Sequence, residues 1–579
     1  MGPAIESLVA SDDMSLGLHQ RSVSADFWSR AASTVSFGSV LLLLLAAPFE
    51  AKTAWLRLSW QSVSSLEVVV LLACVVWAAT LLRAGALPLW RTPLTMPGVL
   101  LLVVLTVASV AAPGGRQNAL HMAGRLACVA VLCGMTLNGV TTLGRARRVL
   151  LVASVSGTLA AALVALDYSG LSIGQHMLGA FRSQTTTVGA QVRASGSFQY
   201  PTITSMFLEI TFACAVGLLP LVWGQRLRPM HVALVASVLV MAAGVTLTLT
   251  RAGFVTMAST LAIVTVQRVR AVGVDRSVLA LVGVAVAVVV IVPILRSTED
   301  MRLRWTSEHQ EAWYRAEIQA PLSLELPTGG QIVVPVTVKN AGRITWDSAA
   351  PAPIRFSYHW LHEEDDRVVS WEGLRALFPA PVAPGQRVRL EVPLEAPRQP
   401  GTYRVVWDIE QQGHLWFSTE PDALLTMSRA VVRGPAIGGA VPTGPFRLMP
   451  MPAARPGRAL LWTAALRMLA ERPWLGVGPD NFRLRYGPYA GLARPDERVH
   501  TNNMYLELLV GGGMLGGLAL VWLVWRCGRT VVSALEVGGD PTRTAVRAAV
   551  AAAVCAVALH GLVDSFLGFT PTYVTIGIM

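Results

Sequence analysis

The sequence predicts a polytopic α-helical membrane protein, a bundle of about 11–12 spans, with an inserted extracytoplasmic β-sandwich. Of its 579 residues, 53% are hydrophobic and only 14% are charged, and the mean hydropathy is +0.52. Runs of roughly twenty apolar residues recur, each long enough to cross a hydrocarbon core of about 30 Å as a helix. Between residues 316 and 432 these runs give way to alternation of apolar and polar residues, which is typical of strands.

The apolar runs divide into about eleven predicted spans. They lie near residues 32–48, 65–83, 96–112, 119–140, 148–167, 201–222, 231–249, 252–267, 277–295, 503–525 and 545–567. A twelfth begins near Phe569 but reaches Met579 after roughly half the length of a crossing, so the last span is expected to be incomplete. The polar residues 1–30 are predicted to form a cytoplasmic tail. They lack the layout of a cleaved signal peptide, so the first span reads as a retained anchor.

Arginine placement predicts the orientation of the bundle. If the N-terminus is inside, most arginines of the short loops fall on the inner side, as cytoplasmic loops require. These arginines are Arg83, Arg91, Arg145, Arg147, Arg148, Arg226, Arg228, Arg268, Arg270, Arg276, Arg526, Arg529, Arg543 and Arg547. The net charge of +12 is therefore partly topological. No nucleic-acid motif accompanies it, and membrane lipids are the expected surroundings.

The outer segment between the ninth and tenth spans has its own organisation. Alternating runs such as 332–338, 388–394 and 403–409, separated by Gly- and Pro-containing turns, predict antiparallel strands with one buried face. About seven strands are expected within 316–432, which favours a β-sandwich. The residues KNAGRITW (339–346), APGQRV (383–388) and PGTYRVVWDIE (400–410) resemble an immunoglobulin-like module.

Five tryptophans of this module admit two interpretations, a buried core or a sugar-stacking face, and the core is favoured because bulky aromatic side chains usually bury. They are Trp346, Trp360, Trp371, Trp407 and Trp416.

The linker and helix region 433–500 follows the predicted β-sandwich. Within it, apolar residues at helical spacing in 454–474 predict an amphipathic helix that ends at Pro473 and lies on the outer membrane face. The bundle is thus divided into 31–296 and 501–579.

Cysteine and metal-ligand patterns are sparse. All six cysteines lie in or beside spans and none lies between residues 296 and 500, so no disulfide framework is expected in the outer segment. No Cys-x-x-Cys motif or His/Cys metal spacing occurs, and the sequence predicts neither a metal nor another cofactor.

The unusual polar residues collect on the predicted outer side. Arg251 lies in a tight hairpin between two spans, Arg193 in the loop after the fifth span, Arg458 at the start of the amphipathic helix, and His500 just before the tenth span. Arginine suits bidentate contacts with phosphate oxygens, and histidine suits proton transfer near neutral pH. The alternatives are an interfacial anchor for Arg251, solvated positions for Arg193 and Arg458, and a helix-start role for His500.

Four segments resemble the O-antigen ligase and polymerase superfamily of bacterial envelope glycosyltransferases. They are LTLTRAG (247–253), GRALLW (457–462), ERPWLGVGPDNF (471–482) and HTNNMYLELLVGGGMLGGL (500–518). With the span pattern, the resemblance covers all but the β-sandwich and the N-terminal tail. The combination is fairly specific for the superfamily but separates ligase from polymerase poorly. The glycines at 476 and 478 are interpreted as shaping a turn, because a lone Gly-x-Gly is weak support for phosphate binding.

The resemblance implies a GT-C-like, metal-independent and inverting transferase that uses an undecaprenyl-diphosphate-linked glycan as donor and a glycan or lipid as acceptor. On that model Arg251 and Arg458 hold the diphosphate, His500 orients or deprotonates the acceptor hydroxyl, and Arg193 is a supporting contact. The enzyme is expected in the bacterial inner membrane with its site facing the periplasm or cell exterior. The inserted β-sandwich departs from the simplest family pattern and leaves the acceptor open.

Charged residues inside spans give one further hypothesis. Arg125 and Glu209 each lie about two turns below the outer surface, and charges at that depth usually pair or serve a pathway. We expect them to face each other beneath the diphosphate site, with Arg125 as a further substrate contact. His560 and Asp564 are weaker candidates for the acceptor side.

Two other classes of function remain open at this point. A flippase for the same lipid-linked sugar would carry charged residues along a path through the bilayer, whereas most here collect at one face. In a binding or anchoring protein the sandwich would bind the ligand, and the bundle would only hold the sandwich at the membrane.

Overall fold

The computed structural model describes residues 27–579 except 59–60, 184–185, 189–190, 223–228, 297, 307–312, 351, 413–414, 421–422, 438–455, 493–494 and 537–539. Most of the polar tail, Arg226 and Arg228 of the orientation argument, and most of the linker after the sandwich lie outside the described residues.

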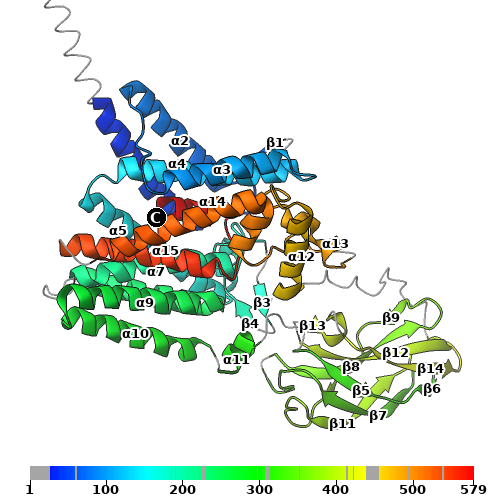
Figure 1. Cartoon of the computed structure of the whole chain (residues 1–579). Coiled ribbons are helices and arrows are strands. Elements are labelled where there is room, and N and C mark those ends of the chain that lie inside the picture. The colour runs from blue at the N-terminus through cyan, green and yellow to red at the C-terminus, as the bar shows by residue number, and fades with distance from the viewer. Residues whose placement is uncertain are drawn as a thin grey trace, which may run out of the picture.

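A bundle of long apolar helices forms most of the molecule, and its members run side by side (Figure 1). Ten helices in the described residues are long and apolar enough to cross a membrane. They are the first span (Phe27–Phe49), α2 (Ser65–Ala84), α4 (Arg116–Gly139), α5 (Leu143–Tyr168), α7 (Pro201–Val222), α8 (Pro229–Thr248), α9 (Arg251–Val272), α10 (Arg276–Leu295), α14 (Met504–Ala534) and α15 (Pro541–His560). The predicted polytopic membrane fold is therefore confirmed.

Two predicted spans have shorter helices. The third coincides with α3 (Thr95–Val110), whose 16 residues extend about 24 Å at 1.5 Å per residue. The incomplete twelfth run forms α16 (Thr570–Ile578), a helix of 9 residues. Every other predicted span coincides with one of the ten longer helices.

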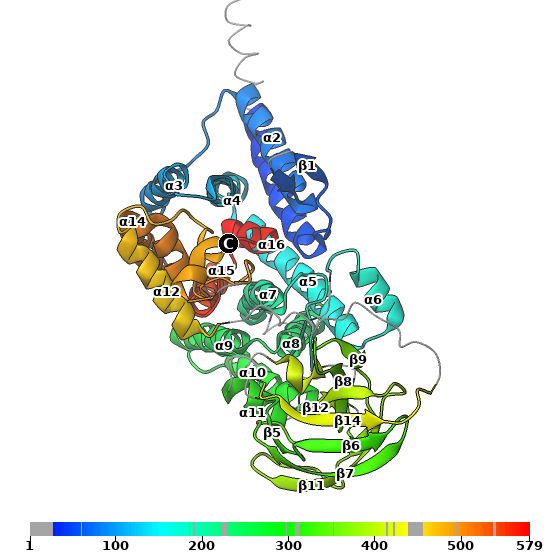
Figure 2. The same ribbon diagram turned by 90° about the vertical axis from the view of Figure 1, so that its right-hand side faces the viewer.

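Helix α7 is the centre of the bundle: it packs against α5, α8, α9 and α15, and Figure 2 views these helices from their ends. Small residues allow the close approach. A Cβ added at Gly157 would lie 2.2 Å from Thr211 Oγ1, and one added at Gly217 would lie 2.3 Å from the Ala549 Cβ. This tight packing holds the polar groups of α7 at fixed positions.

Short elements cover the end of the bundle that faces the sandwich (Figures 1 and 2). They are η1 (Ala47–Phe49), β1 (Leu56–Leu58), β2 (Gln61–Val63), α6 (Ser172–Leu178), β3 (Thr186–Val188), β4 (Gln191–Arg193), α11 (Thr298–Thr306), α12 (Arg458–Glu471) and α13 (Phe482–Tyr489). Helix α12 is the predicted amphipathic helix. Its apolar face, with Leu461 and Met468 fully buried, packs against α13 and α14.

A sheet-rich region fills residues 316–433 and consists of two sheets. One contains β8 (Ile354–His362), β12 (Gly401–Gln411), β14 (Thr426–Arg433), β6 (Ser323–Pro327), β10 (Ala376–Leu377), β9 (Val368–Ser370) and β13 (Leu415–Trp416). The other contains β11 (Arg387–Glu395), β7 (Gln331–Asn340) and β5 (Ala316–Gln319). All the pairings are antiparallel except that of β14 with β6.

The strand alternation follows the predicted register. Val334, Val336 and Val338 on β7 are buried, as are Leu390, Val392 and Leu394 on β11. Three of the five tryptophans, Trp346, Trp360 and Trp407, also belong to this core, which supports the core interpretation. The remaining two are only half-buried; they cover the buried His359 ring, against which Trp371 stacks at 3.9 Å and Trp416 packs edge-on at 4.6 Å.

Candidate functional site

The Gly-rich turn before α13 is joined to the start of α14 by backbone hydrogen bonds. Val477 N donates to Val510 O at 3.0 Å, and Gly478 N donates to Gly511 O at 3.0 Å. Gly476 and Gly478 have φ values of +63° and +93°, which glycine adopts most readily. Gly513 breaks the helical geometry inside α14 and brings its backbone against Trp474. Residues 471–482 and the first turns of α14 are thus one packed unit.

We expect Gly476→Ala to destabilise the protein strongly, because the new Cβ would lie 2.1 Å from Val510 O. The matched control is Gly491→Ala, since Gly491 has a similar φ of +70° but no heavy atom within 4 Å of the added Cβ. The control should lose only the roughly 1–2 kcal/mol of the left-handed conformation. Thermal unfolding of the purified variants checks this, and equal losses in both would contradict the packing argument.

His500 lies between the two parts of this unit in the chain, four residues before α14 begins. Its Nδ1 is 3.5 Å from Glu507 Oε1 and 3.7 Å from Asp480 Oδ1. Glu507 Oε2 accepts a hydrogen bond from Thr501 N at 3.0 Å, and Trp462 Nε1 on α12 donates to Thr501 O at 3.0 Å. The Nδ1 side of the imidazole therefore faces two carboxylates without a hydrogen bond to either, which leaves Nε2 as the nitrogen available to a substrate.

Charge around His500 favours its protonated form. Burial alone would lower the pKa of His500, and Arg483 acts in the same direction, but Glu507 and Asp480 outweigh both and raise it above its ordinary 6.5. The ligand atoms of Asp480, His500 and Glu507 lie within 4.8 Å of one another, so they could hold a small cation. An imidazolium together with Arg483, which pairs with Asp480 at 3.0 Å, balances the two carboxylates equally well.

The turn between α8 and α9 is held by three arginines. Arg193 Nε donates to Thr248 O at 3.0 Å, Arg296 Nη2 donates to Leu247 O at 2.8 Å, and Arg304 Nε donates to Leu249 O at 3.1 Å. The last carbonyls of a helix lack intrahelical partners and carry partial negative charge. The arginines satisfy these carbonyls and so fix the turn from which Arg251 starts α9.

These arginines belong to a basic cluster that also includes Arg251 and Arg458. Burial and the cations Arg193, Arg251 and Arg458 lower the pKa of Arg304 to about 8, while Asp564 acts in the opposite direction. Burial, Arg251 and Arg296 likewise lower the pKa of Arg193 to about 10. Arg193, Arg251 and Arg458 thus lie close enough to Arg304 for their charges to act on it, together with Asp564. Such a site is suited to a multiply charged anion.

The loop after α15 connects this cluster to the His500 segment. Arg458 Nη2 donates to Val563 O at 2.9 Å, and Asn503 Nδ2 donates to the neighbouring Leu562 O at 3.0 Å. Arg193, Arg251 and Arg458 all act on the pKa of Arg304, and the loop that Arg458 contacts is also contacted by Asn503, three residues after His500. The roles expected of these four residues stay predictions.

The expected pairing of Arg125 with Glu209 is wrong. Glu209 accepts from Ser205 Oγ at 2.6 Å and contacts His560 Nδ1 at 3.0 Å. His560 Nε2 is 3.9 Å from Asp564 Oδ2, so these groups form a buried chain that leads to the arginine cluster. Each of Arg125 and Glu209 lies about two turns into its helix, but the neighbouring helix toward which each side chain points was predicted wrongly.

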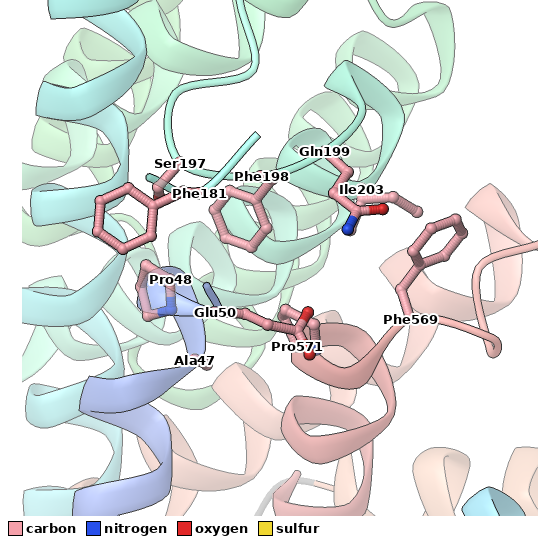
Figure 3. A pocket seen from close by; sticks show the side chains of 10 residues that line it. All are labelled: Ala47, Pro48, Glu50, Phe181, Ser197, Phe198, Gln199, Ile203, Phe569 and Pro571. Carbon is pink, nitrogen blue, oxygen red and sulfur yellow. The ribbon is translucent and has the colours of Figure 1, made fainter. Parts of the chain in front are cut away.

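Arg125 belongs to a second polar group. Its Nε lies 3.1 Å from Glu67 Oε1, and its Nη1 donates to Gly568 O at 2.6 Å. Near this group is a small cavity of about 10 Å³, lined by residues from the end of the first span and the starts of α7 and α16 (Figure 3). Burial raises the pKa of Glu50, which lines it. The cavity has room for about one water, so we assign it no glycan.

Several residues of the site were missed by the sequence argument. Arg296 and Arg304 follow the ninth span, where basic residues on the outer side were a usable signal. Asp480 and Glu507 lie in the same tract as His500, but neither has a distinctive spacing. Asp167 was also missed: it pairs with Arg182 at 2.5 Å and accepts from Ser195 N at 2.8 Å, which holds the loop after Arg193.

Ten membrane-length helices in the described residues define a multi-pass membrane protein, and the members of a basic cluster beside Asp564 come from β4, the start of α9, α11 and α12. The O-antigen ligase family model matches residues 449–521, which include Arg458, the Gly476 turn, His500 and Glu507. Over these residues the chain is similar to the O-antigen ligase superfamily, and this similarity supports a membrane glycosyltransferase-type enzyme. No curated protein matches the chain.

Proposed function

We propose that the protein transfers a glycan from an undecaprenyl-diphosphate-linked donor to an acceptor, a glycan or a lipid, at the outer face of the bacterial inner membrane. The observation that carries the proposal is the convergence of Arg193, Arg251 and Arg458 on Arg304, whose pKa their charges lower. A diphosphate would bring negative charge to these arginines. Arginine forks also match the geometry of phosphate oxygens.

In the proposed reaction the acceptor hydroxyl oxygen attacks the anomeric carbon of the donor. The bond from that carbon to the diphosphate oxygen breaks, and undecaprenyl diphosphate leaves with the electron pair. His500 Nε2 takes the hydroxyl proton, because Nδ1 faces Glu507 and Asp480. Attack from the side opposite the leaving group inverts the anomeric centre. Arg251 and Arg458 stabilise the charge that develops on the diphosphate, which a metal would otherwise neutralise.

Arg193 and Arg125 have supporting roles in this proposal. Arg193 fixes the turn before Arg251 through Thr248 and Thr250. Arg125 anchors the loop that ends at Gly568, so its effect on the donor is transmitted through that loop. We further propose that residues 316–432 form an immunoglobulin-like unit between the linker 433–500 and the first part of the bundle, 31–296.

A polysaccharide polymerase of the same superfamily is the nearest alternative, and an assay with a purified lipid-linked donor separates the two. We expect a single new linkage to a lipid A-core acceptor; a ladder of repeats would instead identify a polymerase. Movement of the donor across proteoliposomes without any transfer would identify a flippase. If the bundle is the enzyme, deletion of residues 316–430 should leave transfer intact. If the full-length protein shows no transferase activity and the deletion abolishes glycan binding, the sandwich is the functional part and the bundle is only its membrane anchor.

Chelation should leave the transfer rate unchanged, because arginines supply the charge that a metal would provide. The measurement is the initial rate with and without EDTA, followed by addition of Mg²⁺, Mn²⁺ or Zn²⁺. A rate that collapses with EDTA and returns with one of these ions would assign a cation to the Asp480, His500 and Glu507 group instead.

A further inference from the structure

A second cavity lies at the end of the bundle opposite the arginine cluster. Its volume is about 220 Å³, and it is enclosed by the last turns of α9, the first turns of α15 and the end of α7. Gln267, which lines it, is 16 residues after Arg251 on α9, so the two are about 24 Å apart along the helix axis. In the proposed orientation this is the cytoplasmic end.

The lining combines a polar part with an apolar wall. Gln267 and Arg268 provide donors, and Thr544, whose Oγ1 donates to Asp540 O at 3.3 Å, lies beside them. Val264, Ala545 and Ala548 provide the wall. Gln267 is only 3% exposed, and its Nε2 has no hydrogen-bond acceptor among the described residues. A buried amide donor without an acceptor is unfavourable and rare in native proteins. An acceptor that enters the cavity would remove this penalty.

Positive charge at the polar part is held in place. Arg268 Nε donates to Ser277 Oγ at 2.7 Å and its Nη2 donates to Asp275 Oδ2 at 2.8 Å. The third guanidinium nitrogen of Arg268, Nη1, takes part in neither of these hydrogen bonds. Thr544 lies in the first turn of α15, where the helix dipole favours an anion. The nearby carboxylates already have partners, since Asp275 binds Arg268 and caps α10, and Asp540 caps α15.

We propose that this cavity binds a glycerophospholipid of the adjacent leaflet, with its phosphate at Gln267 and Arg268, beside the first turn of α15, and the start of an acyl chain along the apolar wall. The volume is more than ten times the ~10–15 Å³ that holds one water by the same measure, which is enough for a phosphate and several methylene groups. A free phosphate would satisfy the donors but would leave the apolar wall unused. This site is separate from the proposed transfer reaction.

The test uses the full-length protein, delipidated in maltoside detergent. Phosphatidylglycerol is added, and retained lipid is measured by native mass spectrometry together with the shift in unfolding temperature. We expect Gln267→Met to weaken phosphatidylglycerol binding about tenfold or more, because a hydrogen bond to a charged group is lost, without destabilising the lipid-free protein. Ala548→Leu should block lipid binding, because the larger side chain would fill the space beside the apolar wall. The control Val266→Met lies on the adjacent, 49% exposed position of α9 and should bind as the wild type does.

Three outcomes would overturn the proposal. The first is an absence of lipid retention and of any thermal shift in the wild type, which would mean that the cavity holds only water. The second is a shift with inorganic phosphate as large as that with phosphatidylglycerol. The third is wild-type lipid affinity in Gln267→Met. A loss of stability of this variant without lipid would also count against the proposal, since it would show that the amide serves the protein itself.

Discussion

Arg251→Gln should lower the rate of glycan transfer by about 10²–10³-fold, the effect typical of removing one group that stabilises developing charge. Arg251 starts α9 in the middle of the basic cluster, so its loss removes charge at the diphosphate rather than packing. Arg251→Lys should recover part of the rate, because lysine keeps the charge but not the bidentate geometry. The measurement is the initial rate with a purified lipid-linked donor.

The matched control for Arg251 is Arg270→Gln, at an exposed position in the last turn of the same helix. It removes one positive charge from α9 at the opposite end of the bundle. Its transfer rate should equal that of the wild type. Wild-type transfer by Arg251→Gln, at a normal amount in the membrane, would reject the assignment of Arg251 to the diphosphate.

His500→Gln should lower the maximal transfer rate by about 10²–10⁴-fold, as expected for the loss of a general base, while the KM for the donor changes little. Glu507→Gln should act through the pH profile instead. Glu507 and Asp480 raise the pKa of His500, and only neutral imidazole accepts a proton, so transfer rises as pH passes through that pKa. Removing the Glu507 charge lowers the pKa and moves the rise to lower pH.

Exposed Glu497 provides the control for this pH shift, since Glu497→Gln changes the same kind of group in the same outer segment. Its profile should coincide with that of the wild type. A pH profile of Glu507→Gln that moves to higher pH, or does not move, would contradict the role of Glu507 in setting the protonation of His500. A large change in donor KM for His500→Gln would assign His500 to the diphosphate rather than to the acceptor.

Most of the fold was predictable because membrane helices and half-buried strands each leave a periodic signal in the sequence. The length and apolarity of α7 or α10 identify a span without any knowledge of neighbours. The alternation in β7 identifies its buried face, and Val334, Val336 and Val338 are buried as expected. The length of α3 was less predictable, because Ala111 and Ala112 continue the apolar run beyond the last helical residue.

The site was predictable only where position alone is informative. Arg251 and His500 stand out because each interrupts an apolar stretch at a predicted membrane boundary. Arg304 does not stand out, because its role comes from a hydrogen bond to Leu249 O, which lies 55 positions earlier in the chain. The Arg125–Glu209 hypothesis failed for a related reason. Helical rise gives the depth of a residue, but its partner depends on rotation about the helix axis and on which helices are adjacent.

The basic cluster has a consequence for turnover. The proposed donor and the released undecaprenyl diphosphate carry the same two phosphates. The arginines repel one another, and an anion bound among them relieves that repulsion. Because both molecules provide the same anion, the arginines are expected to bind the product as well as the donor. Transfer alone therefore does not empty the site. We expect undecaprenyl diphosphate to be a competitive inhibitor with respect to the donor, and its removal from the membrane to set the pace of repeated cycles.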